Sequence, residues 1–66
     1  MKWQILRFKC GHQQHYTDGE GFAPSFDRWS GVFEATKDEA AVLFEKAKSG
    51  CRKTNVCTLP KLYEVV

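Results

Sequence analysis

Long apolar stretches are missing from this sequence. No run approaches the roughly 20 apolar residues that a membrane-spanning helix needs. Lys2, Arg7 and Lys9 interrupt the apolar residues near the N-terminus, where a secretory signal peptide would have an unbroken apolar core. The sequence therefore argues against a membrane span and predicts a protein of the cytoplasm.

Catalytic signatures are also missing. The sequence has no Gly-rich phosphate-binding loop and no pair of carboxylates in a recognisable motif. Cys10 and His12 are two residues apart and merely share a face of a strand, with no acid placed to orient the histidine. A chain of 66 residues leaves little room for a pocket of about 300 Å³ or more. We therefore predict that the protein is not an enzyme and needs no cofactor.

Cysteine is scarce, and its count is odd. Cys10, Cys51 and Cys57 suit free thiols better than a disulfide framework. A disulfide between Cys51 and Cys57 is a second interpretation, and metal ligation is a third.

Zinc is the metal that these residues would suit. Thiolates and imidazoles are good zinc ligands, and bound zinc would stabilise so short a chain. The string KCGH resembles the second half of a zinc-ribbon knuckle, although Arg7 stands where that knuckle has a further cysteine. The candidate zinc ligands are Cys10, His12, Cys51 and Cys57.

Charge is distributed unevenly. Residues 1–10 carry three basic and no acidic residues, residues 11–45 carry two basic and seven acidic residues, and residues 46–66 carry five basic residues and one acidic residue. If the two ends pair in one sheet, they form a basic patch that fits nucleic acid or an acidic protein surface. The alternative is charge that only keeps the protein solvated.

The basic ends supply candidate contact residues. The predicted cationic contacts are Lys2, Arg7, Lys9, Arg52, Lys53 and Lys61, and the rings that can stack on bases are Trp3, Phe8 and Tyr63. Together with the zinc site, this patch gives a second functional hypothesis, a small zinc-stabilised nucleic-acid-binding protein.

Periodicity in the apolar residues predicts one helix and several strands. The helix covers residues 36–50, and the strands cover residues 2–9, 29–35, 54–59 and 62–66. In the first strand the apolar pattern changes phase after Ile5, which indicates either a bulge or a central strand covered on both faces.

Residues 11–27 are predicted to form a long connection. Turn signals occur at Asp18 with Gly19 and at Glu20 with Gly21. Residues 13–17 either extend the first strand or pair in a short hairpin. A connection of this length without its own structure is unusual in a compact domain and is more often functional or mobile.

The helix has the best-defined ends. Thr36 and Glu39 have the spacing of a capping box, and Gly50 can end the helix in a left-handed conformation. One face of the helix is apolar, because four residues recur at helical spacing: Ala40, Leu43, Phe44 and Ala47.

Aromatic residues gather in and beside the long connection. Such rings either cover the open face of the sheet or serve as anchors for a partner. Sequence alone leaves both alternatives open. The candidate contact residues of this region are Tyr16, Phe22, Phe26, Arg28 and Trp29.

The layout of the chain resembles that of many very small bacteriophage proteins, including the anti-CRISPR inhibitors. The resemblance lies in the size and in the strand GVFEA that leads directly into the helix TKDEAAVLFEKA. It implies a compact module that blocks a larger host protein or nucleoprotein complex in the host cytoplasm. These proteins share no common site, so the resemblance assigns no residue a role.

We therefore predict a non-catalytic protein-binding module. Its fold is a single α+β domain over residues 1–66, an antiparallel sheet of three to five strands with one α-helix packed on one face. A homodimer in which a second copy covers the open face of the sheet is a further alternative. The predicted core is Ile5, Phe8, Val32, Phe33, Ala40, Leu43, Phe44, Ala47, Val56, Leu59 and Val65.

Overall fold

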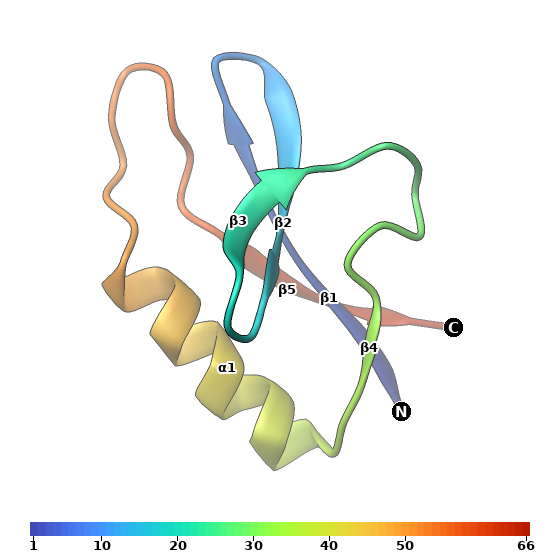
Figure 1. Cartoon of the computed structure of the whole chain (residues 1–66). Coiled ribbons are helices and arrows are strands. Elements are labelled where there is room, and N and C mark those ends of the chain that lie inside the picture. The colour runs from blue at the N-terminus through green and yellow to red at the C-terminus, as the bar shows by residue number, and fades with distance from the viewer.

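A curled antiparallel sheet and one helix make up the structure (Figure 1). This computed structural model describes residues 1–66, and it confirms the predicted α+β fold. The single helix is too short and too polar to cross a membrane. The elements are β1 (Lys2–Lys9), β2 (His12–Thr17), β3 (Gly21–Pro24), β4 (Phe33–Glu34), α1 (Lys37–Ser49) and β5 (Lys61–Val65).

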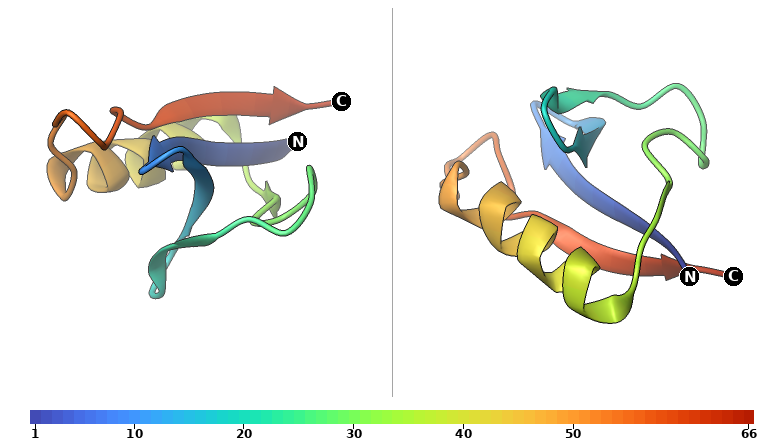
Figure 2. Two further views of the ribbon diagram at one scale, coloured as in Figure 1. Left: turned by 90° about the horizontal axis from the view of Figure 1, so that it is seen from above. Right: turned by 60° about the horizontal axis from the view of Figure 1, so that its bottom comes forward.

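β1 is the central strand. Lys2 pairs with both β4 and β5, and Leu6 pairs with both β2 and β5, so β2 and β4 share one edge of β1 and β5 takes the other. β3 pairs with β2. Lys2 lies opposite Val65, which brings the two chain ends side by side (Figures 1 and 2). The two ends of the chain therefore pair in one sheet, the condition on which the predicted basic patch depends.

Both faces of β1 are partly covered, as one of the two alternatives predicted. The register with β5 runs without a break through Ile5 and Leu6, so no bulge lies there. α1 packs against β1 and β5 on one side, and the loop between β3 and β4 lies on the other side (Figure 2). The apolar pattern of β1 changes phase after Ile5 because the helix packs on one face of the strand and the loop on the other.

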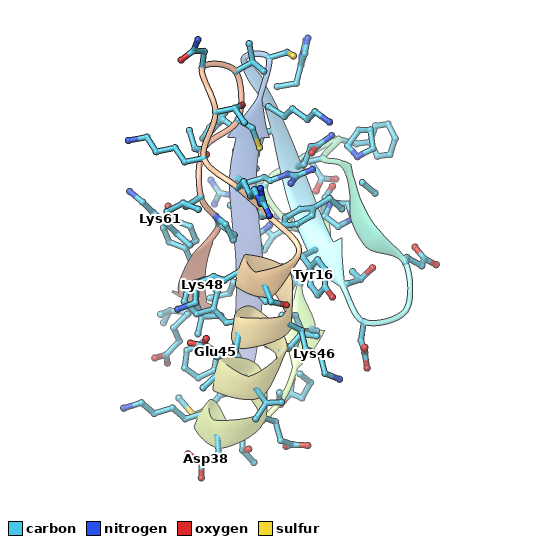
Figure 3. The ribbon with its side chains drawn as sticks, turned by 90° about the vertical axis from the view of Figure 1, so that its left-hand side faces the viewer. Tyr16, Asp38, Glu45, Lys46, Lys48 and Lys61 are labelled. Carbon is cyan, nitrogen blue, oxygen red and sulfur yellow. The ribbon has the colours of Figure 1, made fainter.

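The predicted capping box begins α1. The Thr36 hydroxyl accepts a hydrogen bond from the Glu39 N–H at 3.2 Å, and the Thr36 N–H donates to the Glu39 carboxylate at 3.1 Å. The bond from the Thr36 backbone, followed by the contact with its side chain, holds the pKa of Glu39 below its ordinary value. Asp38 and Lys48 lie near opposite ends of the helix (Figure 3), where each complements the helix dipole.

The predicted left-handed conformation at Gly50 is wrong. Its φ is −92°, so this residue does not use the freedom that glycine offers. The Cys51 N–H instead donates to the Lys48 carbonyl at 3.1 Å. A tight turn of ordinary handedness therefore ends the helix.

The core lies between α1 and β1. Ile5, Ala40 and Ala47 are fully buried, and the two alanines have no bulk to hold the helix away from the sheet. Trp3, which the sequence suggested as a stacking ring, is buried instead, and its indole N–H donates to the Ala35 carbonyl at 2.9 Å. This bond fixes the chain just before the helix begins.

Part of the predicted core is exposed. The side chains of Phe8, Val56 and Leu59 are 49%, 56% and 48% exposed, so their assignment to the core is wrong. Phe8 points to the face of β1 opposite Ile5, at a position where α1 cannot cover it. The other predicted core residues are half-buried, namely Val32, Phe33, Leu43, Phe44 and Val65.

Three predicted segments differ from the structure. Residues 11–27 are not a plain connection, because they form the hairpin of β2 and β3, in line with the hairpin alternative for residues 13–17. The strand predicted over residues 29–35 shrinks to β4. Residues 54–59 form no strand, because the Thr54 hydroxyl accepts hydrogen bonds from Val56 and Cys57 and bends the chain locally.

Candidate functional site

The 25–32 loop, which joins β3 to β4, is held by hydrogen bonds within itself. The Ser30 hydroxyl accepts bonds from the N–H groups of Phe26 at 3.0 Å and Asp27 at 3.2 Å. The Asp27 carboxylate accepts one from the Trp29 N–H at 2.8 Å. Asp and Ser favour such turns because their short side chains reach backbone groups a few residues away. The loop therefore has a defined shape.

The sheet anchors this loop from one side. The buried side-chain amide of Gln4 donates to the carbonyls of Ser30 at 2.8 Å and Arg28 at 3.1 Å. Gly31 has a φ of +77° and packs so closely on the His15 ring that an added Cβ atom would come within 2.5 Å of it. The backbone of the loop thus covers the Gln4 side of the sheet.

The large side chains of the loop are exposed to solvent. Phe26 is 91% exposed and Trp29 is 54% exposed. The Arg28 guanidinium lies 5.1 Å from the centre of the Trp29 ring, within the range of a cation–π contact. The sequence left open whether this region is a cover or a set of anchors. Its backbone is the cover, and its two rings are free to act as anchors.

Tyr16, Phe22 and Arg7 belong to a different group of side chains. The Tyr16 and Phe22 rings meet edge to face across β2 and β3, with 5.0 Å between their centres. The Arg7 guanidinium lies over Phe22 at 3.6 Å and donates to the Gln14 side chain at 2.9 Å. Tyr16 is visible from the side of α1 (Figure 3). These three predicted contact residues stack on one another, away from Phe26 and Trp29.

Lys9, Arg52 and Lys53 are exposed, as a contact surface requires. Lys9 ends β1 and forms an isolated bridge with Cys57, so the segment after α1 lies beside the end of β1. Residues 1–17 and 46–63 contain no Asp or Glu. These stretches meet at this end of the sheet and give it a basic surface.

The structure does not bring the four candidate zinc ligands together in one site. Cys51 and Cys57 are buried with 3.9 Å between their sulfur atoms, and the Arg7 guanidinium approaches the Cys51 sulfur at 3.2 Å. Burial, followed by the hydrogen bond with Cys51, raises the pKa of the Cys57 thiol, so the thiolate form that binds metal is disfavoured. Cys10 is exposed. No group of three or more His, Cys, Asp or Glu side chains is arranged to hold a metal, and the zinc site stays a prediction.

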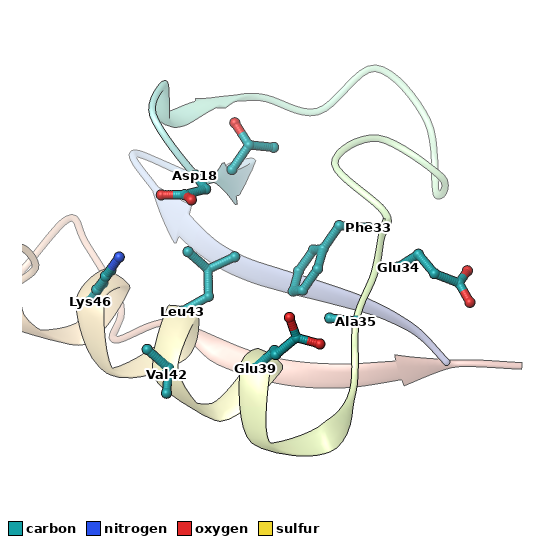
Figure 4. Close-up of a pocket in the computed structure, with 9 residues that line it drawn as sticks. Asp18, Phe33, Glu34, Ala35, Glu39, Val42, Leu43 and Lys46 are labelled. Carbon is teal, nitrogen blue, oxygen red and sulfur yellow. The ribbon is translucent and has the colours of Figure 1, made fainter.

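The structure also contains a groove that the sequence did not indicate. It lies between α1, β4 and the turn after β2, and its volume of about 470 Å³ exceeds what we expected of so short a chain. Phe33 and Leu43 extend into it (Figure 4). The Thr17 hydroxyl at its edge is buried without a hydrogen-bond partner. The lining is Thr17, Asp18, Phe33, Glu34, Ala35, Glu39, Val42, Leu43 and Lys46.

Sequence reasoning missed the residues that shape the 25–32 loop. The spacing of Asp27 and Ser30 is a turn signal and was open to recognition. Gln4 gave no signal, because a single glutamine within a strand does not show which carbonyls it will meet. Its partners are 24 and 26 residues away along the chain.

Comparisons of the chain with protein-family models, curated proteins and solved structures give no match. The comparisons therefore assign no function to the chain.

Proposed function

We propose that this protein is a non-catalytic binding module that docks on a larger protein through the exposed side chains of the 25–32 loop. One observation carries the proposal. The loop is ordered by hydrogen bonds to the sheet and within itself, yet Phe26 and Trp29 remain exposed on it. A chain that buries few large side chains would gain more stability by burying these rings than by exposing them, so their exposure favours a role in binding.

The chemistry of the loop suits a protein partner. Trp and Arg are among the residues that most often dominate binding energy at protein interfaces, and large rings supply much contact area. Binding is also favoured when the contact residues are already ordered, because less conformational entropy is lost. Phe26, Arg28 and Trp29 meet both conditions.

The mode of action that we propose is stoichiometric blocking in the cytoplasm. Two considerations support it. The layout resembles that of small phage inhibitors, which implies a module that covers a site on a larger host protein. A loop with two rings and one arginine is also a compact contact that a chain of 66 residues can present.

Affinity capture with the whole protein as bait tests this proposal. We expect one larger protein in near-equal amount, captured after nuclease treatment of the lysate. Phe26→Ala and Trp29→Ala should each reduce capture at least about tenfold, as expected when a hot-spot ring is removed. Because both side chains are exposed, each variant should keep the melting temperature of the parent.

Val42→Ala is the matched control, because it removes an exposed apolar side chain from α1, away from the loop. Capture should survive this change. If capture survives Phe26→Ala and Trp29→Ala as well, or if no single partner is enriched over a bait-free control, the loop is not the docking surface. Phe22→Ala is unsuitable here, because Phe22 stacks against Arg7 and Tyr16.

A further inference from the structure

The face of the sheet that carries the 25–32 loop is only partly covered. The loop contacts the side chain of Gln4, but Leu6 and Phe8 follow on the same face of β1, because side chains alternate along a strand. In the neighbouring strand Tyr63 lies opposite Gln4 and Lys61 lies opposite Leu6. This less covered area is the open strip, made up of the half-buried Leu6 and the exposed Phe8, Leu59, Lys61 and Tyr63.

The open strip is a shallow hollow with exposed rings. It encloses about 350 Å³, and Phe8 and Tyr63 are 49% and 46% exposed. The backbone under Phe8 is fixed, because its N–H donates to the Thr58 hydroxyl at 2.9 Å and its carbonyl accepts from the Thr58 N–H at 2.8 Å. The strip therefore presents two rings from neighbouring strands on a rigid support.

The charge around the open strip is positive. Its residues come from two acid-free stretches, 1–17 and 46–63. Lys61 extends from β5 into solvent (Figure 3), and Lys53 lines an adjoining hollow together with Phe8 and Thr58. Glu64 is next to Tyr63 in sequence, but its side chain is opposite Trp3 on the other face. No carboxylate lines the strip or the adjoining hollow.

We propose that the open strip binds single-stranded nucleic acid. Phe8 and Tyr63 stack on bases, and Lys53 and Lys61 contact phosphates. Exposed rings on a sheet surface beside lysines are the combination that single strands require, because every unpaired base offers a face for stacking. The core of a protein interface is instead depleted in lysine, which disfavours a protein partner at this surface. A duplex hides its base faces and offers nothing for the rings to stack on.

The inference reaches beyond the proposed protein docking and uses other residues. The strip and the 25–32 loop lie on the same face of the sheet, so one partner that contains both protein and nucleic acid can contact both. Either surface can fail its test while the other passes.

Fluorescence anisotropy with the purified whole protein tests the inference. The probes are labelled single-stranded DNA and RNA of mixed sequence, about ten nucleotides long, within the size range of single-strand sites, and a duplex of the same length. We expect binding that prefers the single strands and weakens with salt. With two lysines on phosphates, the slope of log K against log salt should be about −1.4.

The variants Phe8→Leu and Tyr63→Leu remove the rings but keep apolar bulk. Each should weaken binding roughly fivefold to a hundredfold, the effect of losing one stacked base. Lys53→Gln and Lys61→Gln should each flatten the salt slope by about 0.7. Lys37→Gln, which changes an exposed lysine at the start of α1, is the control and should leave the affinity unchanged. Circular dichroism and the melting temperature verify that every variant is folded.

Three results would overturn the inference. The first is a wild-type protein that binds no single strand at low salt. The second is binding that is as strong to the duplex, or that is unchanged by both Phe8→Leu and Tyr63→Leu. The third is a wild-type dimer in solution that Phe8→Leu dissociates, because a second copy would then cover the strip.

Discussion

The two faces of β1 are covered in opposite ways. On the helix side, side chains fill the space, and Ile5, Ala40 and Ala47 are fully buried. On the loop side, backbone covers the sheet, and the buried Gln4 amide binds two of its carbonyls. Side chains that could have filled this second face are left exposed. A short chain can thus close a sheet with hydrogen-bonded backbone and keep its large rings for binding.

Shortening a side chain of β1 should lower the free energy of unfolding more on the helix side than on the loop side. Ile5→Ala should destabilise the protein by about 2–5 kcal/mol, because it leaves a cavity in the only side-chain core. Phe8→Ala should cost less than about 1 kcal/mol, because this ring is half exposed. Urea unfolding of both variants measures the difference.

The milder change Ile5→Val, with an expected cost of about 0.5–1.5 kcal/mol, keeps this comparison measurable if Ile5→Ala does not fold. Equal losses for Phe8→Ala and Ile5→Ala would contradict the distinction between the two faces.

The backbone cover should be sensitive to a single added methyl group. In Gly31→Ala the new Cβ would lie 2.5 Å from the His15 ring, whereas in Gly19→Ala it would meet nothing within 4 Å. Both glycines have positive φ, +77° and +90°, so both variants carry the same kind of backbone strain. Gly31→Ala should therefore lose roughly 1–3 kcal/mol more than Gly19→Ala, the usual cost of overpacking.

Thermal unfolding of the two glycine variants measures this difference. If the two lose the same stability, the loop does not pack on the sheet as described. Gly31→Ala should also weaken partner capture, since a displaced loop no longer presents Trp29 correctly.

The smallest effect is expected at the start of α1, where the interactions are local. The lowered pKa of Glu39 means that its contribution to stability is complete above the ordinary carboxylate pKa and is lost as the pH falls through the lowered value. Glu39→Gln keeps a side chain that can complete the capping box but removes this titration. Melting temperatures across acidic pH should show a steeper decline for the parent than for the variant. A parallel decline would show that the ionised form of Glu39 does not stabilise the helix.

Sequence patterns were informative where the interactions are local. The first strand has its predicted bounds, and the helix differs by one residue at each end from the predicted span. Thr36 and Glu39 are three residues apart, so the capping box is visible in the sequence itself. The strand predicted over residues 29–35 was right only for Phe33–Glu34. The strand predicted over residues 54–59 was wrong because the Thr54 side chain competes for the backbone N–H groups of Val56 and Cys57.

The sequence predicted which residues could form the candidate site but not which of them lie together in space. Phe26 and Trp29 are exposed as an anchor requires, whereas Phe22 and Arg7 stack together elsewhere. Composition gives the number of rings but not the face of the sheet to which each one points. That depends on register, since a shift by one residue would exchange the two faces of a strand.

The sequence by itself determined the α+β class, the bounds of the first strand, the helix and its cap. These follow from periodicity and from contacts between residues close in the chain. Only the tertiary structure decided which rings are free and where the basic ends meet. Gln4 binds Arg28 across 24 residues, and Arg7 approaches Cys51 across 44. Contacts at such separations form only when the whole sheet has closed, so no local pattern records them.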